Sequence, residues 1–185
     1  MTGQATHHAS ISRVEIIKLN IPYKEPFVIS LGVIPSATNV LVRIHTDDGL
    51  AGTGECAPFV YIVGETQETV FELGGKVGKL LLGKDPFAIE DRLGEIDRAV
   101  KGNPTMKSAF DMALYDLLAL RADMPLYRLL GGSNDREVCT DMTISLGDPD
   151  KMSRDALAFQ KDGFPAIKVK LGTTCREDLA RIRAI

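Results

Sequence analysis

The stretch Ile167-Lys168-Val169-Lys170-Leu171 alternates apolar and charged residues, and this alternation predicts a β-strand. Lys168 and Lys170 then point to one face of that strand. Repulsion between the two ammonium groups, together with desolvation if the face is enclosed, favours the neutral amine. A neutral lysine can act as a general base near neutral pH. The alternative is an exposed edge strand whose lysines lie in water and discourage aggregation. These residues alone favour the edge strand, so the surrounding sequence has to decide.

The sequence around this stretch predicts a strand–helix repeat after Gly132. A polar linker precedes a strand, a helix, a second strand and a second helix, over residues 138–145, 149–161, 166–171 and from 174 onward. The last helix begins with a capping box, formed by Thr174 and Glu177. This order of elements is typical of a parallel α/β fold. Because the sequence ends at Ile185 without a helix stop signal, we expect it to be the N-terminal part of a longer protein.

The sequence before Gly132 predicts an antiparallel meander followed by helices. Alternating residues and the turn signal Asp47-Asp48-Gly49 predict three strands, over residues 13–19, 39–45 and 50–55. The clearest helix begins at Asn103-Pro104, a cap followed by a proline at the first helical position. Further helices are predicted from the cap Thr66 to near Gly83, over 86–100, and over 126–130 before Gly131-Gly132.

The composition is that of an ordinary globular protein, with 44% hydrophobic and 25% charged residues among 185. A net charge of −3 argues against nucleic-acid binding, and no apolar run is long enough to span a membrane. Residues 1–11 lack the apolar core of a signal peptide and are predicted to form a disordered tail, with His7-His8 solvated. Cys56, Cys139 and Cys175 have neither zinc nor disulfide spacing, so we expect a cytoplasmic protein.

Three motifs follow one another along the chain. They are Ser108-Ala109-Phe110-Asp111-Met112-Ala113-Leu114-Tyr115-Asp116-Leu117-Leu118, then Pro125-Leu126-Tyr127-Arg128-Leu129-Leu130-Gly131-Gly132, then the Lys-x-Lys strand. In this order, and preceded by the meander, they resemble the muconate lactonizing enzyme subgroup of the enolase superfamily from about Ser12 onward. Within that subgroup, the segment Thr140-Asp141-Met142-Thr143-Ile144-Ser145 most resembles the dipeptide epimerases.

The resemblance implies the fold class and the domain boundaries. Residues 12–132 would form an α+β capping domain, a three-stranded antiparallel meander plus a helical bundle. Residues 133–185 would form the first two βα units of an incomplete (β/α) TIM-like barrel. Catalytic groups of such barrels lie at the carboxyl ends of the strands, where the Lys-x-Lys strand ends.

The resemblance also implies a reaction: abstraction of the proton next to a carboxylate, with bound Mg²⁺ stabilising the enediolate. Lys170 would be the acid/base, and Lys168 would assist it and contact the developing enolate. Thr143 would face the substrate, although a strand threonine with a satisfied hydroxyl is nearly as good an interpretation. The metal-binding carboxylates and a partner lysine are expected on later barrel strands, so we expect no metal ligand here and no activity from these residues alone. The whole enzyme would be a homo-oligomer acting on a dipeptide or related carboxylate.

Two segments of the cap, residues 26–35 and 55–65, are expected to close over the site as a specificity lid. Some epimerases for acidic dipeptides carry an arginine in the first segment, where this chain has Gly32. The substrate is therefore expected to be a neutral or hydrophobic dipeptide. The Gly54-Glu55 pair also recurs in the family, and Glu55 is expected to be structural.

Several alternatives remain open at this point. Within the superfamily they are a muconate-type cycloisomerase and an o-succinylbenzoate synthase or N-acylamino acid racemase, which share the Lys-x-Lys strand. If the natural chain ends at Ile185, a non-catalytic cap module is expected instead, because the metal ligands would be missing. Asp111 and Asp116 lie five residues apart on one helix and so face different sides, which favours structural hydrogen bonds at the cap–barrel junction. Tyr115 is expected to pack.

Overall fold

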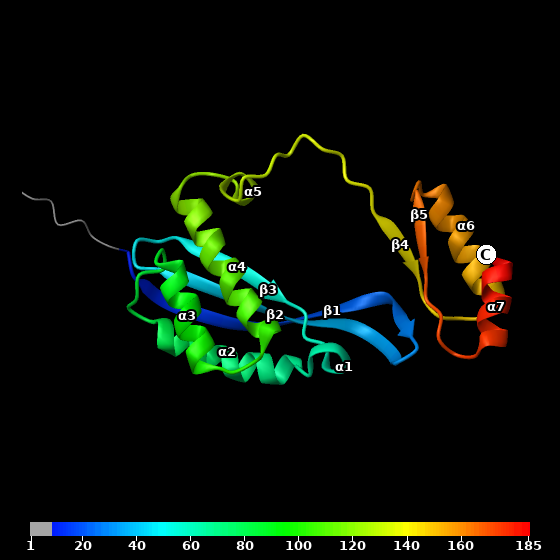
Figure 1. The fold of residues 1–185 in the computed structure, drawn as a ribbon, viewed down its shortest axis with the longest axis horizontal. Helices are drawn as coiled ribbons and strands as arrows, with labels where there is room; N and C mark the ends of the chain where they lie inside the picture. Colours follow the sequence, from blue (N-terminus) through cyan, green and yellow to red (C-terminus); the bar gives the residue numbers. More distant parts are fainter. Residues whose placement is uncertain (1–8) are drawn as a thin grey trace, which may run out of the picture. The chain divides into compact units, whose positions relative to one another are not determined.

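The computed structural model describes residues 9–185, which form two compact units (Figure 1). Unit 1 contains the described residues up to Asn20 together with Thr38–Asn134, and unit 2 contains Ile21–Ala37 together with Asp135–Ile185. Residues 21–37, which form the end of the hairpin made by the first two strands, therefore belong to the same unit as the C-terminal residues. The boundary that we predicted after residue 132 stays a proposal.

The sheet of unit 1 contains three strands, β1 (Ile11–Ile29), β2 (Gly32–Thr46) and β3 (Ala51–Cys56), in the order β1-β2-β3. Strands β2 and β3 are antiparallel, and the residue pairs run from Val40 with Cys56 to His45 with Ala51. This arrangement confirms the predicted antiparallel meander.

The first hairpin is much longer than its sequence pattern predicts. Strand β1 continues through Ile29 and β2 begins at Gly32, so residues 26–35 form the end of a hairpin rather than an irregular loop. The predicted strands over 13–19 and 39–45 are only the inner part of this hairpin. The outer part was missed because its side chains do not alternate between buried and exposed positions.

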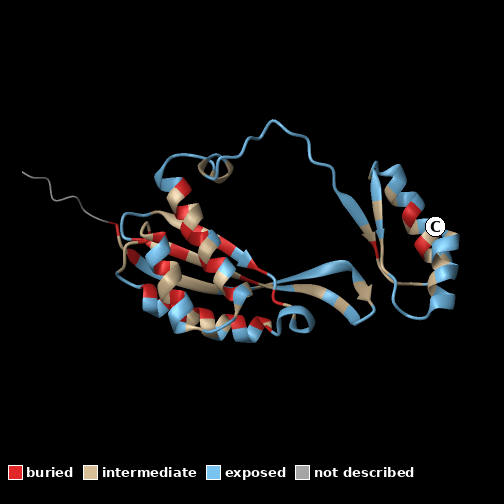
Figure 2. Ribbon diagram, viewed as in Figure 1, coloured by how far each residue is buried: buried red, intermediate tan, exposed pale blue. Residues whose placement is uncertain are grey.

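Helices of unit 1 pack on one another and on the sheet. They are α1 (Val60–Val63), α2 (Gln67–Leu81), α3 (Ile89–Ala99), α4 (Pro104–Arg121) and α5 (Leu126–Leu129). The core joins Val40, Val42 and Ile44 of β2 to Phe110 and Leu114 of α4, all of them fully buried. Figure 2 shows buried residues gathered where the helices face the sheet.

Helix α4 lies so close to β3 that β3 has to carry glycine. A Cβ added at Gly54 would lie 2.0 Å from the Ala109 carbonyl oxygen. The amide of Thr53 donates a hydrogen bond of 2.9 Å to Asp116 Oδ2 of the same helix. Asp116 is therefore structural, as predicted, but it joins α4 to β3 inside unit 1. Tyr115 packs against the core, also as predicted.

The N-terminus of α4 is capped by a distant residue. Asn103 adopts a left-handed conformation with φ of 55°, and its side chain does not cap the helix, contrary to our prediction. Instead the buried carboxylate of Glu65 accepts hydrogen bonds from the amides of Thr105 and Met106, at 2.9 and 3.1 Å. A carboxylate at this position satisfies unpaired amides and interacts favourably with the helix dipole.

Residues 9–11, the end of the segment predicted as a disordered tail, are packed in the structure. Residues 1–8, including His7-His8, lie outside the described residues. Ala9 is buried, and Ile11 is 1% exposed and begins β1, so disorder was wrong for the end of this segment. The Ile11 amide donates to the carbonyl oxygen of Lys84 at 2.8 Å, which joins the start of β1 to the end of α2.

Unit 2 contains the predicted strand–helix–strand–helix repeat, made of β4 (Asp141–Ile144), α6 (Pro149–Lys161), β5 (Ala166–Val169) and α7 (Cys175–Ala184). The two strands are parallel. Strand β4 begins at Asp141 rather than near Val138, whose side chain is 86% exposed and has no strand beside it. Ile144, Met152 and Ala156 form a small core between the strands and α6. Among residues 9–185, no helix combines the length and hydrophobicity that crossing a membrane requires.

Candidate functional site

The two predicted lysines and the predicted threonine lie on one face of the β4–β5 pair. Thr143 is directly opposite Lys168 in the parallel register, so their side chains share a face. Lys170 is two residues further along and continues this face, and its amide still donates to the Ile144 carbonyl oxygen at 3.2 Å. The opposite face packs on α6 through Ile144, Ile167 and Val169. The structure therefore brings all three predicted site residues together, away from the small core.

The end of the β1–β2 hairpin belongs to the same unit and lies near β4 and β5 (Figure 1). The Val28 carbonyl oxygen accepts a hydrogen bond of 2.9 Å from the Leu146 amide, just after β4. The ring centroid of Phe27 lies 5.8 Å from Lys170 Nζ, which is within the range of a cation–π contact. The hairpin thus brings an aromatic ring to the predicted acid/base.

A salt bridge connects the hairpin to α6. Lys151 Nζ lies 3.1 Å from Glu25 Oε2 of the hairpin and 2.7 Å from Asp155 Oδ2 of its own helix. Hydrogen bonds to Asp155 and then to Glu25 raise the pKa of Lys151. Glu25 is 75% exposed, and ion pairs this exposed contribute little stability. The Glu25–Lys151 ion pair therefore contributes little to the free energy that holds the hairpin against α6.

The second predicted lid segment, residues 55–65, belongs to unit 1. It contains the short helix α1, where Tyr61 and Ile62 are 67% and 78% exposed. The carboxylate of Glu55 accepts a hydrogen bond of 2.6 Å from Asn39 Nδ2, which agrees with a structural role. Glu65, at the other end, caps α4. The segment presents apolar side chains between two anchored glutamates.

The remaining titratable groups do not add to the candidate site. Across residues 9–185, no three His, Cys, Asp or Glu side chains come together in a way that could hold a metal ion. We therefore assign none of the described residues to a metal. Burial raises the pKa of the Cys56 thiol to about 11, so this cysteine is not a nucleophile at neutral pH. Burial, and then the Glu90 carboxylate, raise the pKa of Asp111.

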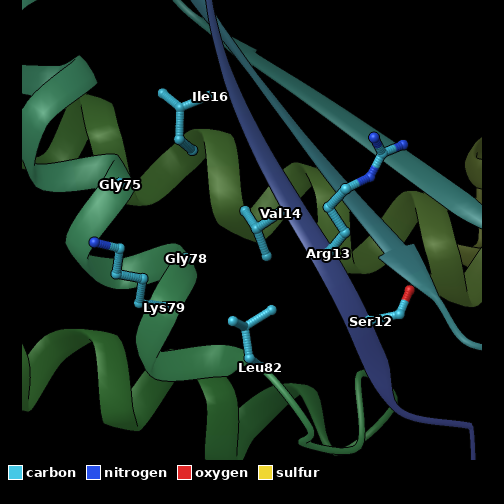
Figure 3. Close-up of a pocket in the computed structure, with 8 residues that line it drawn as sticks. All are labelled: Ser12, Arg13, Val14, Ile16, Gly75, Gly78, Lys79 and Leu82. Carbon is cyan, nitrogen blue, oxygen red and sulfur yellow. The ribbon is translucent and has the colours of Figure 1, made fainter.

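A groove of about 370 Å³ lies between β1 and α2, entirely within unit 1 (Figure 3). Val14 and Ile16 point toward α2, whereas Arg13 points to the other side of the strand (Figure 3). Gly75 and Gly78 line the facing side of α2 and add no side chain that would fill the groove. None of the three predicted site residues lines this groove, and its facing walls are apolar. It is a packing groove between a strand and a helix.

The sequence predicted Lys168, Lys170 and Thr143 but missed the residues that hold the hairpin against them. Phe27 fell inside the predicted lid segment without being singled out. Leu146 acts through its backbone amide, which carries no sequence signal. Gly172 did have a signal, because it directly follows the predicted strand over residues 166–171, and a glycine there marks a special backbone conformation or a close approach.

Residues 11–131 match the family described as mandelate racemase / muconate lactonizing enzyme, N-terminal domain. This match covers more than half of the chain, and the chain belongs to that family. The observed fold, a three-stranded antiparallel sheet with helices followed by a parallel two-stranded start of a barrel, is the one that the resemblance implied.

Several characterised proteins are similar over nearly the whole chain. The D-Ala-D/L-Ala epimerase of Cytophaga hutchinsonii is 46% identical over 95% of this chain and 48% of its own length. The hydrophobic dipeptide epimerase of Enterococcus faecalis is 39% identical over 95% of this chain and 49% of its own length. A crystal structure of the Cytophaga hutchinsonii dipeptide epimerase, complexed with Mg and the dipeptide D-Ala-L-Val, matches with a TM-score of 0.91 at 45% identity. The match covers 95% of this chain and 48% of that chain. The chain thus spans about half the length of the curated relatives it matches.

Proposed function

We propose that this chain forms the cap and the first barrel strands of a racemase or epimerase that removes the proton next to a carboxylate in a dipeptide. The observation that carries the proposal is the common face shared by Thr143, Lys168 and Lys170, at the carboxyl ends of two parallel strands. The similarity to dipeptide epimerases supports the substrate class.

Each residue of that face has a role in the proposal. Lys170 removes the α-proton from one substrate stereoisomer, so its amine has to be neutral when it accepts the proton. A lysine from a later barrel strand then delivers a proton to the opposite face of the α-carbon, and the two lysines exchange roles for the other stereoisomer. Lys168 places a second ammonium beside it and contacts the developing enolate. Thr143, opposite Lys168, offers its hydroxyl to the substrate backbone. Magnesium belongs to the proposal as the cofactor of the whole enzyme, because the similar crystal structure holds it.

The proposed substrate is a neutral or hydrophobic dipeptide. Gly32, near the end of the hairpin, gives no cation for an acidic side chain. Phe27 on the same hairpin adds an aromatic surface beside Lys170. The two relatives named above are described as acting on D-Ala-D/L-Ala and on hydrophobic dipeptides, which agrees with this choice. We also propose a cytoplasmic enzyme, which the free thiols of Cys56, Cys139 and Cys175 support.

The test is the exchange of the substrate α-proton with solvent deuterium, followed separately for each stereoisomer in the whole enzyme. Lys170→Ala should lower the exchange of the stereoisomer that Lys170 deprotonates by about 10²- to 10⁴-fold, which is the usual contribution of a general base. Lys170→Arg should fail nearly as badly, because a guanidinium stays protonated. Lys168→Ala should lower the rate of α-proton exchange by a smaller factor than Lys170→Ala does. Lys161→Ala, an exposed lysine at the end of α6, is the matched control and should leave exchange unchanged. Exchange of both stereoisomers at the wild-type rate in Lys170→Ala would contradict the proposal.

A further inference from the structure

The glycine after β5 lies in direct contact with the end of the hairpin. Gly172 follows Lys170 by two residues and has φ of +122°, a backbone conformation that residues with a side chain rarely adopt. A Cβ added there would lie 3.0 Å from Ser30 Cβ and 3.4 Å from Ser30 Oγ. Ser30 is one of the two residues that connect β1 to β2. The turn of the hairpin therefore touches the backbone at Gly172.

This contact point is itself held firmly. The Gly172 amide donates a hydrogen bond of 3.0 Å to Asp178 Oδ2, in the first turns of α7. Asp178 also accepts a hydrogen bond of 2.8 Å from Arg181 NH1, and Arg181 Nε donates to the Gly147 carbonyl oxygen at 2.9 Å. The loops after β4 and β5 are thus tied together through α7. A contact with Gly172 is a contact with this tied surface.

The hairpin has few other attachments, so this contact has a large share in fixing its position. Among the described residues of unit 2, the structure also gives one backbone hydrogen bond, from Leu146 to Val28, the exposed ion pair between Glu25 and Lys151, and the contact of Phe27 with Lys170. Ser30 Cβ is bonded directly to the backbone and has no rotamer that avoids Gly172. A Cβ added at Gly172 would therefore require the backbone on one side of the contact to move by a few tenths of an ångström.

We propose that Gly172 is a positioning residue: its missing side chain forms the seat for Ser30, and this seat sets the distance between Phe27 and Lys170. The seat and its effect on the hairpin stand on the geometry alone. Their effect on catalysis rests on the proposed function. The competing explanation is that the chain needs glycine here only for its backbone conformation.

Hydrogen–deuterium exchange of the 185-residue chain, followed by mass spectrometry, separates these explanations. Gly172→Ala should speed exchange of peptides covering residues 24–33 by about tenfold, which corresponds to about 1.4 kcal/mol of lost docking free energy. The matched control is Gly163→Ala. Gly163 also has a positive φ, +91°, but a Cβ there would meet no atom within 4 Å. Gly163→Ala should therefore strain the local backbone but leave hydrogen exchange of the hairpin unchanged.

Two substitutions at Ser30 test the contact itself. Ser30→Gly removes both atoms that the new Cβ would meet, so it should restore slow exchange in the Gly172→Ala background. Ser30→Ala keeps the Cβ that lies 3.0 Å away and should not restore it. Ser30→Val adds bulk from the hairpin side while Gly172 stays native. It should speed exchange as Gly172→Ala does, and it keeps the test valid if Gly172→Ala does not fold.

Activity of the whole enzyme extends the test to catalysis. A displaced hairpin should raise KM for the dipeptide and lower kcat for Gly172→Ala, and adding Ser30→Gly should restore both. Unchanged hairpin exchange in Gly172→Ala and Ser30→Val would overturn the inference, as would equal effects of Gly163→Ala, or equal rescue by Ser30→Ala and Ser30→Gly. If exchange follows the expected pattern but the wild-type enzyme epimerises no dipeptide, the seat stands and the proposed function fails.

Discussion

The two units differ in what their residues are used for. Unit 1 fills the space between its sheet and its helices with fully buried side chains, such as Ile44, Phe110 and Leu114. Unit 2 buries only Ile144, Met152 and Ala156 among its described residues, and it leaves the opposite face of β4–β5 to Thr143, Lys168 and Lys170. Most of the hydrophobic stabilisation lies in the first unit, and the candidate chemistry lies in the second.

This difference shows why the hairpin matters. Its base, up to Asn20 and from Thr38, is part of the well-packed sheet, and its end, Ile21–Ala37, contacts the candidate site. A long antiparallel pair is stiff because each strand holds the other through backbone hydrogen bonds. The hairpin end therefore carries Phe27 and Ser30 within unit 2, whereas the hairpin base belongs to the sheet of unit 1. If packing sets stability, the two units should differ in stability as they differ in packing.

The largest effect is expected for Gly54→Ala in unit 1. The new Cβ would lie 2.0 Å from the backbone carbonyl oxygen of Ala109, and the nearest atoms are all backbone atoms of α4, which cannot rotate out of the way. We expect a loss of more than about 3 kcal/mol in the free energy of unfolding, measured by urea denaturation. The control is Gly75→Ala, because a Cβ there meets nothing within 4 Å in α2 and alanine favours helix. If both variants are equally stable, the close packing of α4 on β3 is wrong.

A second comparison deletes one core side chain from each unit. Phe110→Ala should cost about 3–5 kcal/mol and speed hydrogen exchange throughout unit 1. Met152→Ala should cost about 2–3 kcal/mol, at the low end for a buried methionine because the core of unit 2 is small. Its faster exchange should be confined to residues 135–185 and the hairpin end. Equal acceleration of exchange in β2 and α4 by Met152→Ala would show that the two units unfold together.

Sequence reasoning succeeded where a single element carries its own signal. The meander, α4 and the strand–helix repeat follow from periodicity and turn residues, and these elements were confirmed. Lys168 and Lys170 were placed on one face because residues two apart on a strand share a face, whereas Thr143 was named from the family resemblance. The shared face of the two lysines needs only local geometry.

Sequence reasoning was incomplete where the structure depends on contacts between distant residues. Glu65 caps α4 from forty residues away in place of Asn103, because its carboxylate reaches two amides that the asparagine leaves unpaired. The outer hairpin reaches β4 and β5 through Val28 and Ser30, whose partners lie more than a hundred residues away. Neither pairing leaves a periodic pattern, so a single sequence cannot reveal it.

Replacing the distant cap measures one such contact. Glu65→Gln keeps the size of the side chain but removes the charge, and its amide nitrogen cannot accept from a backbone N–H. We expect a loss of about 1–2 kcal/mol, the usual value of a helix cap, in urea denaturation. Asn103→Gly should cost less, because glycine tolerates the left-handed backbone and the asparagine side chain bonds only to the Lys101 carbonyl oxygen. The reverse order would restore Asn103 as the cap.

The smallest effects are expected from acid, and they too should separate the units. In unit 1, hydrogen bonds from Arg92 and then Lys84 hold the pKa of Glu95 below its ordinary value of 4.5. In unit 2, the Lys151 amide bonded to the N-cap carboxylate lowers the pKa of Asp148 below 3.8. A carboxyl with a lowered pKa in the folded state stabilises that state above its unfolded pKa. The stabilisation disappears as the pH falls through the folded pKa.

Glu95→Gln should therefore weaken unit 1 at pH 7 and make little difference near pH 2, and Asp148→Asn should do the same for the start of α6. The measurement is hydrogen exchange of peptides from α3 and from α6, corrected for the intrinsic pH dependence of exchange. Glu95→Gln should speed exchange in α3 and leave α6 unchanged, and Asp148→Asn should do the reverse. Asparagine still accepts one hydrogen bond at an N-cap, so the second effect is the weaker one. An equal response of both helices to either variant would mean that the packing of unit 1 and the packing of unit 2 are a single cooperative structure, and the division between core and chemistry drawn above would not hold.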